Sequence, residues 1–175
     1  MTSSPVEDAR ALLFRRGRAD DAPFLAELAG EAFGVYGDYA PVVAAWAVDP
    51  FVETTIAEQA GAPAAAAFLV FLKPAEAPHT RVGDLLGLAV AAPFRGRGLG
   101  SALLAHVVAR ARHVAARHDI EAVRLAVAEG NAPARRLFES AGFVYYEALG
   151  SYPNGQKALH MRLPLPRGGR RGRLI

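Results

Sequence analysis

The stretch Leu85–Leu104, LLGLAVAAPFRGRGLGSALL, changes character twice within its length. It begins as an apolar run typical of a buried strand, passes through the glycine- and arginine-rich segment Arg95–Gly100, and continues with the apolar spacing of a helix. Glycines at three alternate positions cost conformational entropy, and each lowers helix propensity by about 1 kcal/mol if it is helical. A simple connection between a strand and a helix does not need that cost, so the segment points to a binding role.

Two common phosphate-binding motifs do not fit this segment. A Walker loop requires a lysine after its second glycine, and none is present here. The dinucleotide fingerprint Gly-x-Gly-x-x-Gly would need glycine where Ser101 stands. What remains besides a structural turn is a cradle for an anion of the phosphate type. Glycines let backbone amides approach such an anion, the start of the next helix offers free N–H groups, and Arg95 and Arg97 add cationic donors.

The rest of the chain surrounds this junction with strands and short helices. Strand hairpins combined with one β-α-β crossover predict an α/β (α+β) domain, with a mixed, mostly antiparallel sheet of six to seven strands and about four helices on its two faces. Residues 74–84 are expected to form a loop. The predicted strands are 11–19, 52–59, 64–73, 85–90, 122–128, 144–150 and 158–165, and the predicted helices are 20–33, 41–50, 98–118 and a short one within 131–143.

Two segments resemble a known enzyme family, the GCN5-related N-acetyltransferases (GNAT). LAVAAPFRGRGLGSALL is similar to its acetyl-CoA-binding motif, Arg/Gln-x-x-Gly-x-Gly/Ala, with Arg95, Gly98 and Gly100 at the three defining positions. NAPARRLFESAGF, residues 131–143, is similar to its second motif, Asn-x-x-Ala-x-x-Leu-Tyr-x-x-x-Gly-Phe. The resemblance extends over residues 10–165 and implies a single GNAT-like domain, followed by a basic Gly/Arg-rich tail, 166–175, that we expect to be disordered.

The resemblance implies a cofactor site for acetyl-CoA as co-substrate. Backbone groups of the strand would bind the pantetheine arm, the glycine-rich segment would hold the pyrophosphate, Asn131 would contact the arm, and Phe138 would lie near the thioester. Arg135 or Arg136 could reach the 3′-phosphate, or either could be a solvated helix residue. The implied strand and loop residues are Leu88, Ala89, Val90, Arg95, Gly96, Arg97, Gly98, Leu99, Gly100 and Ser101.

The same resemblance implies direct attack of an acceptor amine on the thioester, but the expected proton-transfer groups are missing. Phe138 stands where many members have a tyrosine acid. Tyr152-Pro153 and Ala158–Met161 are similar to the end of the ribosomal-protein N-terminal acetyltransferases, yet Ala126 stands where that subgroup tends to have a glutamate. We therefore predict Tyr152 as the catalytic residue, with a packing role as the alternative.

Acceptor and metal sites have weaker signals. Tyr36, Asp38 and Tyr39 fall between the first two predicted helices, where they could bind a cationic amine or could be ordinary turn residues. Glu53 and Glu58 should face opposite sides of one strand, so at most one faces the site. The five histidines (79, 106, 113, 118 and 160) have no metal-ligand spacing, so we predict no metal site and read them as structural or solvated.

Composition limits the class of protein. A chain of 175 residues, 52% hydrophobic and 21% charged, is expected to be one globular domain. It has no cysteine, no signal-peptide pattern and no apolar run of about 20 residues, so we expect a cytoplasmic protein without a membrane partner. The net charge is +3, but the last nine residues alone contain four arginines, so residues 1–166 are slightly acidic. We therefore do not expect the domain to bind nucleic acid.

These observations predict an acetyl-CoA-dependent N-acetyltransferase acting on a small-molecule amine or a peptide N-terminus. A non-catalytic acyl-CoA-binding module is the alternative, since the expected acid and base are missing. Nucleic-acid binding through the arginine-rich tail is a third, weaker hypothesis, and a homodimer is compatible with the sequence.

Overall fold

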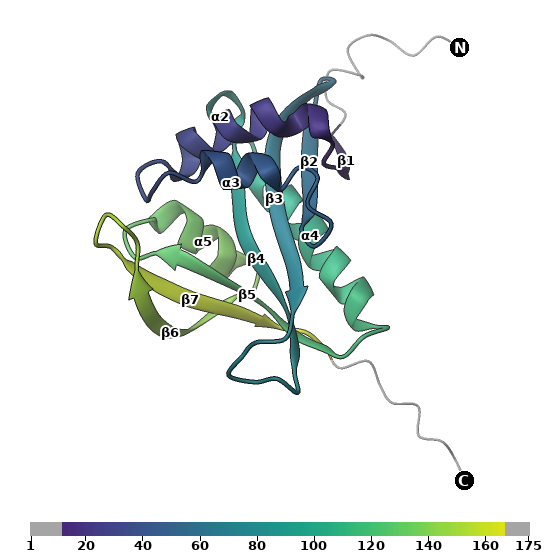
Figure 1. The fold of residues 1–175 in the computed structure, drawn as a ribbon, viewed down its shortest axis with the longest axis vertical. Helices are drawn as coiled ribbons and strands as arrows, with labels where there is room; N and C mark the ends of the chain where they lie inside the picture. Colours follow the sequence, from purple (N-terminus) through teal and green to yellow (C-terminus); the bar gives the residue numbers. More distant parts are fainter. Residues whose placement is uncertain (1–11, 167–175) are drawn as a thin grey trace.

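In the computed structural model, which describes residues 12–166, a seven-stranded sheet lies between two helical layers (Figure 1). Its strand order is β1-β2-β3-β4-β5-β7-β6. The strands are β1 Leu12–Arg16, β2 Glu53–Gln59, β3 Ala62–Leu72, β4 Arg81–Val90, β5 Ile120–Ala128, β6 Val144–Ser151 and β7 Lys157–Pro164. The helices are α2 Ala22–Phe33, α3 Ala40–Ala45, α4 Leu99–Ala115 and α5 Ala132–Ser140, with single 3-10 turns η1 Ala19–Asp21 and η2 Ala92–Phe94. The predicted fold class and element order are confirmed, and residues 167–175 of the predicted tail lie outside the described part of the chain.

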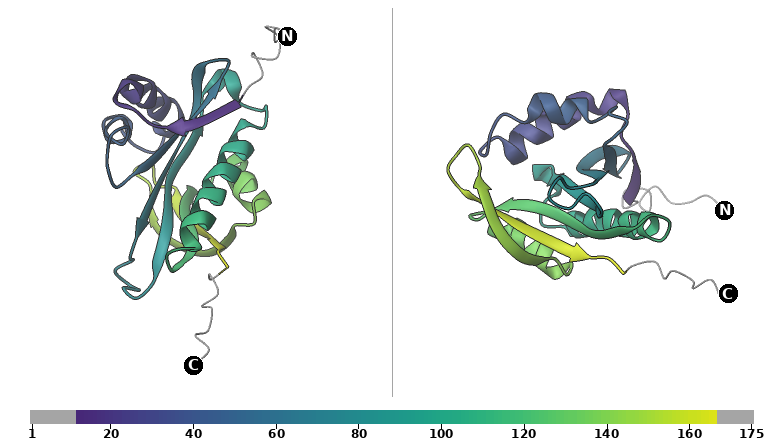
Figure 2. Two further views of the ribbon diagram at one scale, coloured as in Figure 1. Left: turned by 90° about the vertical axis from the view of Figure 1, so that its right-hand side faces the viewer. Right: turned by 60° about the horizontal axis from the view of Figure 1, so that its bottom comes forward.

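The two faces of the sheet carry separate hydrophobic cores. Helices α2 and α3 cover one face, and α4 and α5 cover the other (Figure 2). Strand β3 serves both cores, because Ala65 and Ala67 pack toward α4 while Ala66 and Phe68 pack toward α2 and α3, all four fully buried. The alanine-rich composition noted in the sequence therefore has a packing function, since small side chains let both helical layers lie close to a central strand.

Strand β4 starts earlier than predicted. Residues 81–84 were expected to end a loop, but all four pair with β5, and Val82, Gly83 and Asp84 also pair with β3. A Cβ at Gly83 would make ordinary contacts with Leu69 and Phe71 at 3.4 Å, so this position does not require glycine. Glycine and aspartate are common in turns, so Gly83 and Asp84 favoured a loop in the sequence. Pairing with the neighbouring strands overrides this local preference. Helix α4 also ends earlier than the predicted residue 118, and α3 ends at Ala45 rather than near residue 50.

Strands β4 and β5 separate halfway along their length. They run parallel and pair from Arg81↔Ile120 to Asp84↔Arg124, and no pair follows although the two strands continue to Val90 and Ala128. Just beyond the last pair, Leu86 has no partner on β3, because Leu85 pairs with Leu69 and Gly87 with Phe68. Such a β-bulge bends its strand and increases the twist. An opening in the middle of the sheet is the result (Figure 1).

Candidate active site

A cavity of about 730 Å³ occupies the opening between β4 and β5. Its floor comes from Leu85–Leu88 of β4 and Leu125–Ala128 of β5, the segments in which these two strands no longer pair with each other. Residues of α2, α3 and the loop between them line one wall, and residues of α5 and of β6 and β7 line the rest. The cavity is thus formed by elements from both halves of the chain, and it exists because two parallel strands lack their pairing.

At the amino end of α4 the backbone amides are not capped by any side chain. Gly96 and Gly98 have φ angles of +72° and +80°, a conformation that favours glycine. Gly98 is the N-cap of α4, no side chain caps its amides, and no acidic residue lies in the first turn. The intrahelical ladder starts with the Ala102 amide, which donates to the Gly98 carbonyl at 3.0 Å. The amides before it therefore have no helical partner and, with the helix dipole, suit a phosphate group.

The two predicted cationic donors of this loop have different surroundings. Arg95 donates from Nε to the Val90 carbonyl at 2.8 Å, and its Nη2 lies 3.3 Å from a carboxylate oxygen of Glu31. It therefore connects the loop to the end of β4 and to α2. Arg97 makes no hydrogen bond or ion pair with residues 12–166, so its guanidinium is the one available to a ligand.

The predicted residues of β4 divide between the two faces of the sheet. Leu88 lines the cavity, whereas the Ala89 side chain is buried in the core beneath α2 and α3. Val90 packs toward α4, where its side chain would be 3.6 Å from a Cβ at Gly100. Since β4 has no partner on its β5 side beyond Asp84, backbone groups of this segment are open along the cavity.

Helix α5 contributes Asn131 and Phe138 to the cavity wall. Asn131 caps the helix, because its Oδ1 accepts from the Ala134 amide at 3.2 Å. Phe138 is 8% exposed and packs against Phe143 with ring centroids 5.8 Å apart. Arg135 has a buried Nε without a hydrogen-bond partner among the described residues. That buried donor distinguishes Arg135 from the exposed Arg136.

Three tyrosines form the wall on the opposite side. Tyr36, Tyr39 and Tyr152 all line the cavity, and the rings of Tyr36 and Tyr152 lie 5.2 Å apart. The hairpin that carries Tyr152 is held to the α2–α3 loop, because Asn154 Nδ2 donates to the Val35 carbonyl at 3.0 Å. Burial, with smaller contributions from Tyr39 and Tyr36, raises the pKa of Tyr152. Its phenol therefore keeps its proton at neutral pH.

Asp38 differs from its tyrosine neighbours in position, because it is exposed and does not line the cavity. The two strand glutamates also lie elsewhere. Glu53 binds Arg110 of α4 at 2.7 and 2.8 Å, and Glu58 binds Arg15 at 2.5 Å. Their predicted orientation to opposite faces is confirmed, and neither one lines the cavity.

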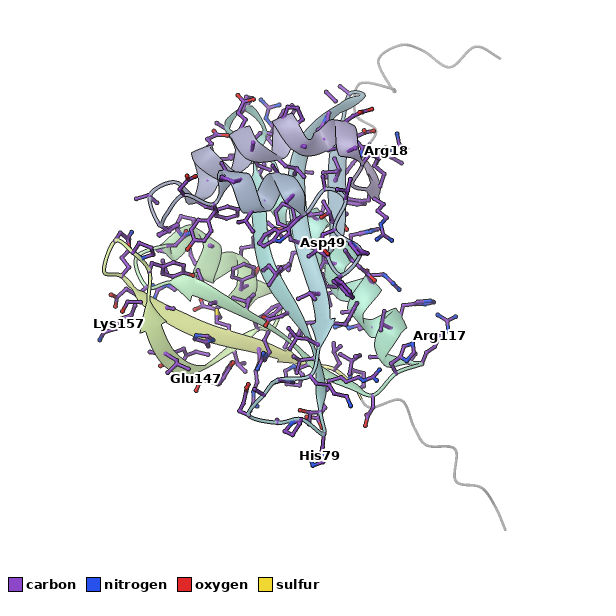
Figure 3. The ribbon with its side chains drawn as sticks, viewed as in Figure 1. Arg18, Asp49, His79, Arg117, Glu147 and Lys157 are labelled. Atoms are coloured by element: carbon purple, nitrogen blue, oxygen red, sulfur yellow. The ribbon has the colours of Figure 1, made fainter. Side chains whose placement is uncertain are left out.

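A polar group that sequence reasoning missed lines the cavity where the two strands begin to separate. Arg124 binds Glu76 at 2.8 Å and Asp84 at 3.2 Å, and His160 lies nearby on β7. Tyr146 and the exposed Glu147 of β6 complete the group, and Figure 3 shows Glu147 at the outer side of that strand. A signal for His160 was present in the sequence. In β7 it alternates with the core residues Met161 and Leu163, so it must face away from the core of α4 and α5.

Other candidate groups lie outside this cavity. Among the described residues, no three His, Cys, Asp or Glu side chains lie close enough together to hold a metal ion. His106 stacks on Phe14 with centroids 4.4 Å apart, which fits the structural role expected for it. No helix within residues 12–166 is both long and apolar enough to cross a bilayer.

Comparison with known proteins agrees with this geometry. The sequence profile described as "Acetyltransferase (GNAT) family" matches residues 11–143. The chain belongs to the GNAT family. It is accordingly an N-acetyltransferase of the kind that uses acetyl-CoA, as the two sequence motifs predicted. A search of curated protein sequences gives no significant match.

Several solved structures share the fold over nearly their whole length. A GNAT-family protein from Desulfovibrio desulfuricans is 26% identical, with a TM-score of 0.71 over 88% of this chain and 99% of that chain. The ribosomal-protein-S18-alanine N-acetyltransferase from Escherichia coli is 22% identical, with a TM-score of 0.71 over 92% and 98%. Arabidopsis thaliana NAA60 in complex with acetyl-CoA is 15% identical, with a TM-score of 0.74 over 88% and 98%. At such identities the last two establish the fold alone.

Proposed function

We propose that this GNAT protein transfers the acetyl group of acetyl-CoA to a primary amine, which attacks the thioester carbonyl directly. The observation that carries the proposal is the opening between β4 and β5, which reaches the tyrosine wall, together with the uncapped start of α4, where Gly100 lies beside Val90 at the end of β4. The opening can take an extended ligand arm beside β4, because the β4 backbone beyond Asp84 lacks a strand partner on its β5 side.

The residues along β4 and around the starts of α4 and α5 fit the cofactor. Gly96–Ser101 would hold the pyrophosphate through backbone amides, with Arg97 as the available cation. Arg135, with its partnerless buried Nε, would face the 3′-phosphate. Leu88–Val90 would bind the pantetheine arm through the backbone, and Asn131 lies where it can contact the same arm.

The remaining polar residues of the cavity suit an amine acceptor. Three carboxylates, Glu76, Asp84 and Glu147, and one cation, Arg124, line the cavity where β4 and β5 begin to separate. The acidic excess favours a cationic acceptor. A backbone N–H near Val90 would stabilise the oxyanion, and the Tyr152 phenol would donate a proton to the sulfur as the C–S bond breaks. Tyr36 and Tyr39 would contact the acceptor.

The acceptor is a small-molecule amine or a peptide N-terminus in a cytoplasmic setting. The Escherichia coli neighbour is described as acting on an alanine of a ribosomal protein, and a peptide amine is therefore worth testing first. Family membership favours the enzyme over the non-catalytic acyl-CoA-binding module, although Phe138 and Ala126 stand in the positions of the expected acid and base.

A panel of acceptors tests the proposal. Spermidine, lysine amide and tetrapeptides that begin with alanine, serine or methionine are each incubated with acetyl-CoA, and released thiol is measured. We expect at least one primary amine to give saturable CoA release and an acetylated product by mass spectrometry. Calorimetric binding of acetyl-CoA with no release above hydrolysis for any acceptor would support the binding module instead.

A further inference from the structure

We propose that His160 is the general base of this enzyme and takes the proton that the acceptor ammonium must lose before it attacks. This inference rests on the proposed acetyl transfer. It starts from the missing carboxylate at Ala126, which is exposed on β5 and lines the cavity. Across the ladder, the register partner of Ala126 is His160. Directly opposed residues on neighbouring strands share a face of the sheet, so the imidazole stands beside the position of the missing carboxylate.

The hydrogen bond of His160 leaves one ring nitrogen available. Nε2 lies 3.1 Å from the carbonyl oxygen of Leu149, and that oxygen can only accept. The neutral ring therefore carries its proton on Nε2, and Nδ1 holds a lone pair. Within residues 12–166, Nδ1 has no hydrogen-bond partner. Leu149 thus fixes the tautomer that a base requires.

Most groups around His160 are protonated, cationic or already engaged, and Glu147 is the carboxylate that remains. Tyr146 lies edge-on with its ring 6.1 Å away, and burial raises its pKa, so it keeps its proton. Arg162 lies over the Tyr146 ring at 5.6 Å and is a cation. Glu147 is the register partner of His160 on β6 and is exposed. On β4 and β5, Asp84 is engaged by Arg124, which also binds Glu76 in the β3–β4 loop.

Four proton transfers accompany the acetyl transfer. The acceptor ammonium gives one proton to Nδ1 of His160 through a water molecule, and the freed amine forms the C–N bond at the thioester carbonyl. The C–S bond breaks, and the sulfur receives the Tyr152 proton. Tyr152 regains a proton from the nitrogen of the new amide. The imidazolium releases its proton to solvent, so the products are the amide, CoA thiol and one proton.

The variant His160→Gln separates catalysis from structure, because the glutamine amide can still donate to the Leu149 carbonyl but cannot take a proton. His79→Gln is the matched control, since His79 is exposed in the β3–β4 loop outside the cavity (Figure 3). With the best acceptor of the panel, we expect kcat/KM of H160Q to fall about 100-fold or more, the typical contribution of a general base. The Kd for acetyl-CoA should stay unchanged, and H79Q should behave as the unaltered enzyme.

The pH profile gives the decisive readout. A general base works only in its unprotonated form, so kcat/KM should rise with pH in the unaltered enzyme and lose this rise in H160Q. Adding Ala126→Glu to H160Q should restore at least tenfold of kcat/KM and the rise with pH, because the carboxylate can take the proton in place of the imidazole. A retained rise in H160Q, or a double variant as slow as H160Q, would overturn the assignment. An unaltered enzyme that acetylates nothing would instead refute the proposed function, and this base with it.

Discussion

Replacing Gly98 by alanine tests whether the start of α4 is built to hold an anion. Gly98 has φ +80°, and an added Cβ would meet no protein atom within 4 Å. The stability cost is therefore backbone strain alone, about 1–2 kcal/mol for an L-residue in the left-handed region. For a chain of this size that loss lowers Tm by roughly 2–8 °C. The open space around the Cβ is also where a bound pyrophosphate would approach the amides.

The effect on binding should exceed the effect on stability. Loss of one charge-assisted hydrogen bond costs about 1.5–3 kcal/mol, which corresponds to an increase of roughly 10- to 150-fold in the Kd for acetyl-CoA. Gly61→Ala is the matched control, because Gly61 has φ +76° and equally open surroundings in the β2–β3 turn, away from the site. Calorimetric titration and thermal melts of both variants give the comparison. Equal destabilisation with the unaltered Kd in both variants would refute the anion cradle at α4.

The remaining predictions concern proton donation and the structural ion pairs. Tyr152→Phe should lower kcat by about 100-fold or more while the Kd for acetyl-CoA stays constant, and the exposed Tyr145→Phe should change neither; equal kcat values for both variants would exclude Tyr152 from proton transfer. Arg15→Met should lower the free energy of unfolding by about 3–5 kcal/mol in urea titrations, because it leaves the buried Asp21 carboxylate without the two 2.7 Å bonds from Arg15. Those hydrogen bonds lower the pKa of Asp21, so stability should be constant above its ordinary value near 3.9 and fall as the pH drops through the lowered pKa. In R15M this acid-dependent loss should shrink, and an unchanged loss would assign the pH dependence to other carboxylates.

Local patterns were sufficient to predict most of the fold. The alternation in β2 and the apolar face of α4 were readable because a strand of period two and a helix of period 3.6 bury different positions. The start of β4 could not be predicted, because Gly83 and Asp84 are residues that favour turns. In the fold, pairing with β3 and β5 overrides that preference. The bulge at Leu86 was hidden for a similar reason, since it depends on the register against β3.

The two ends of the site also differed in how far they could be predicted from the sequence. The anion-binding end is contiguous in sequence, so its glycines and the following helix could be interpreted together. The acceptor end is assembled from β4, β5, β6 and β7, and its groups have no common sequence spacing. His160 was therefore read as structural or solvated, although the register of β5 against β7 places it opposite Ala126. Tyr152 lines the predicted site, whereas Asp38 does not.

The short pairing between β4 and β5 has a consequence for motion. Four residue pairs, Arg81↔Ile120 to Asp84↔Arg124, are the only strand pairs that join the β1–β4 part of the sheet to the β5–β7–β6 part among the described residues, while the core beneath α4 spans both parts. We expect any relative movement of the two parts to be concentrated at this short ladder, while each part keeps its own ladder intact. A ligand arm lying in the opening would act as a strut between them. Amide hydrogen exchange along Leu85–Val90 should therefore slow on cofactor binding, and so should exchange in β5 on the far side of the opening.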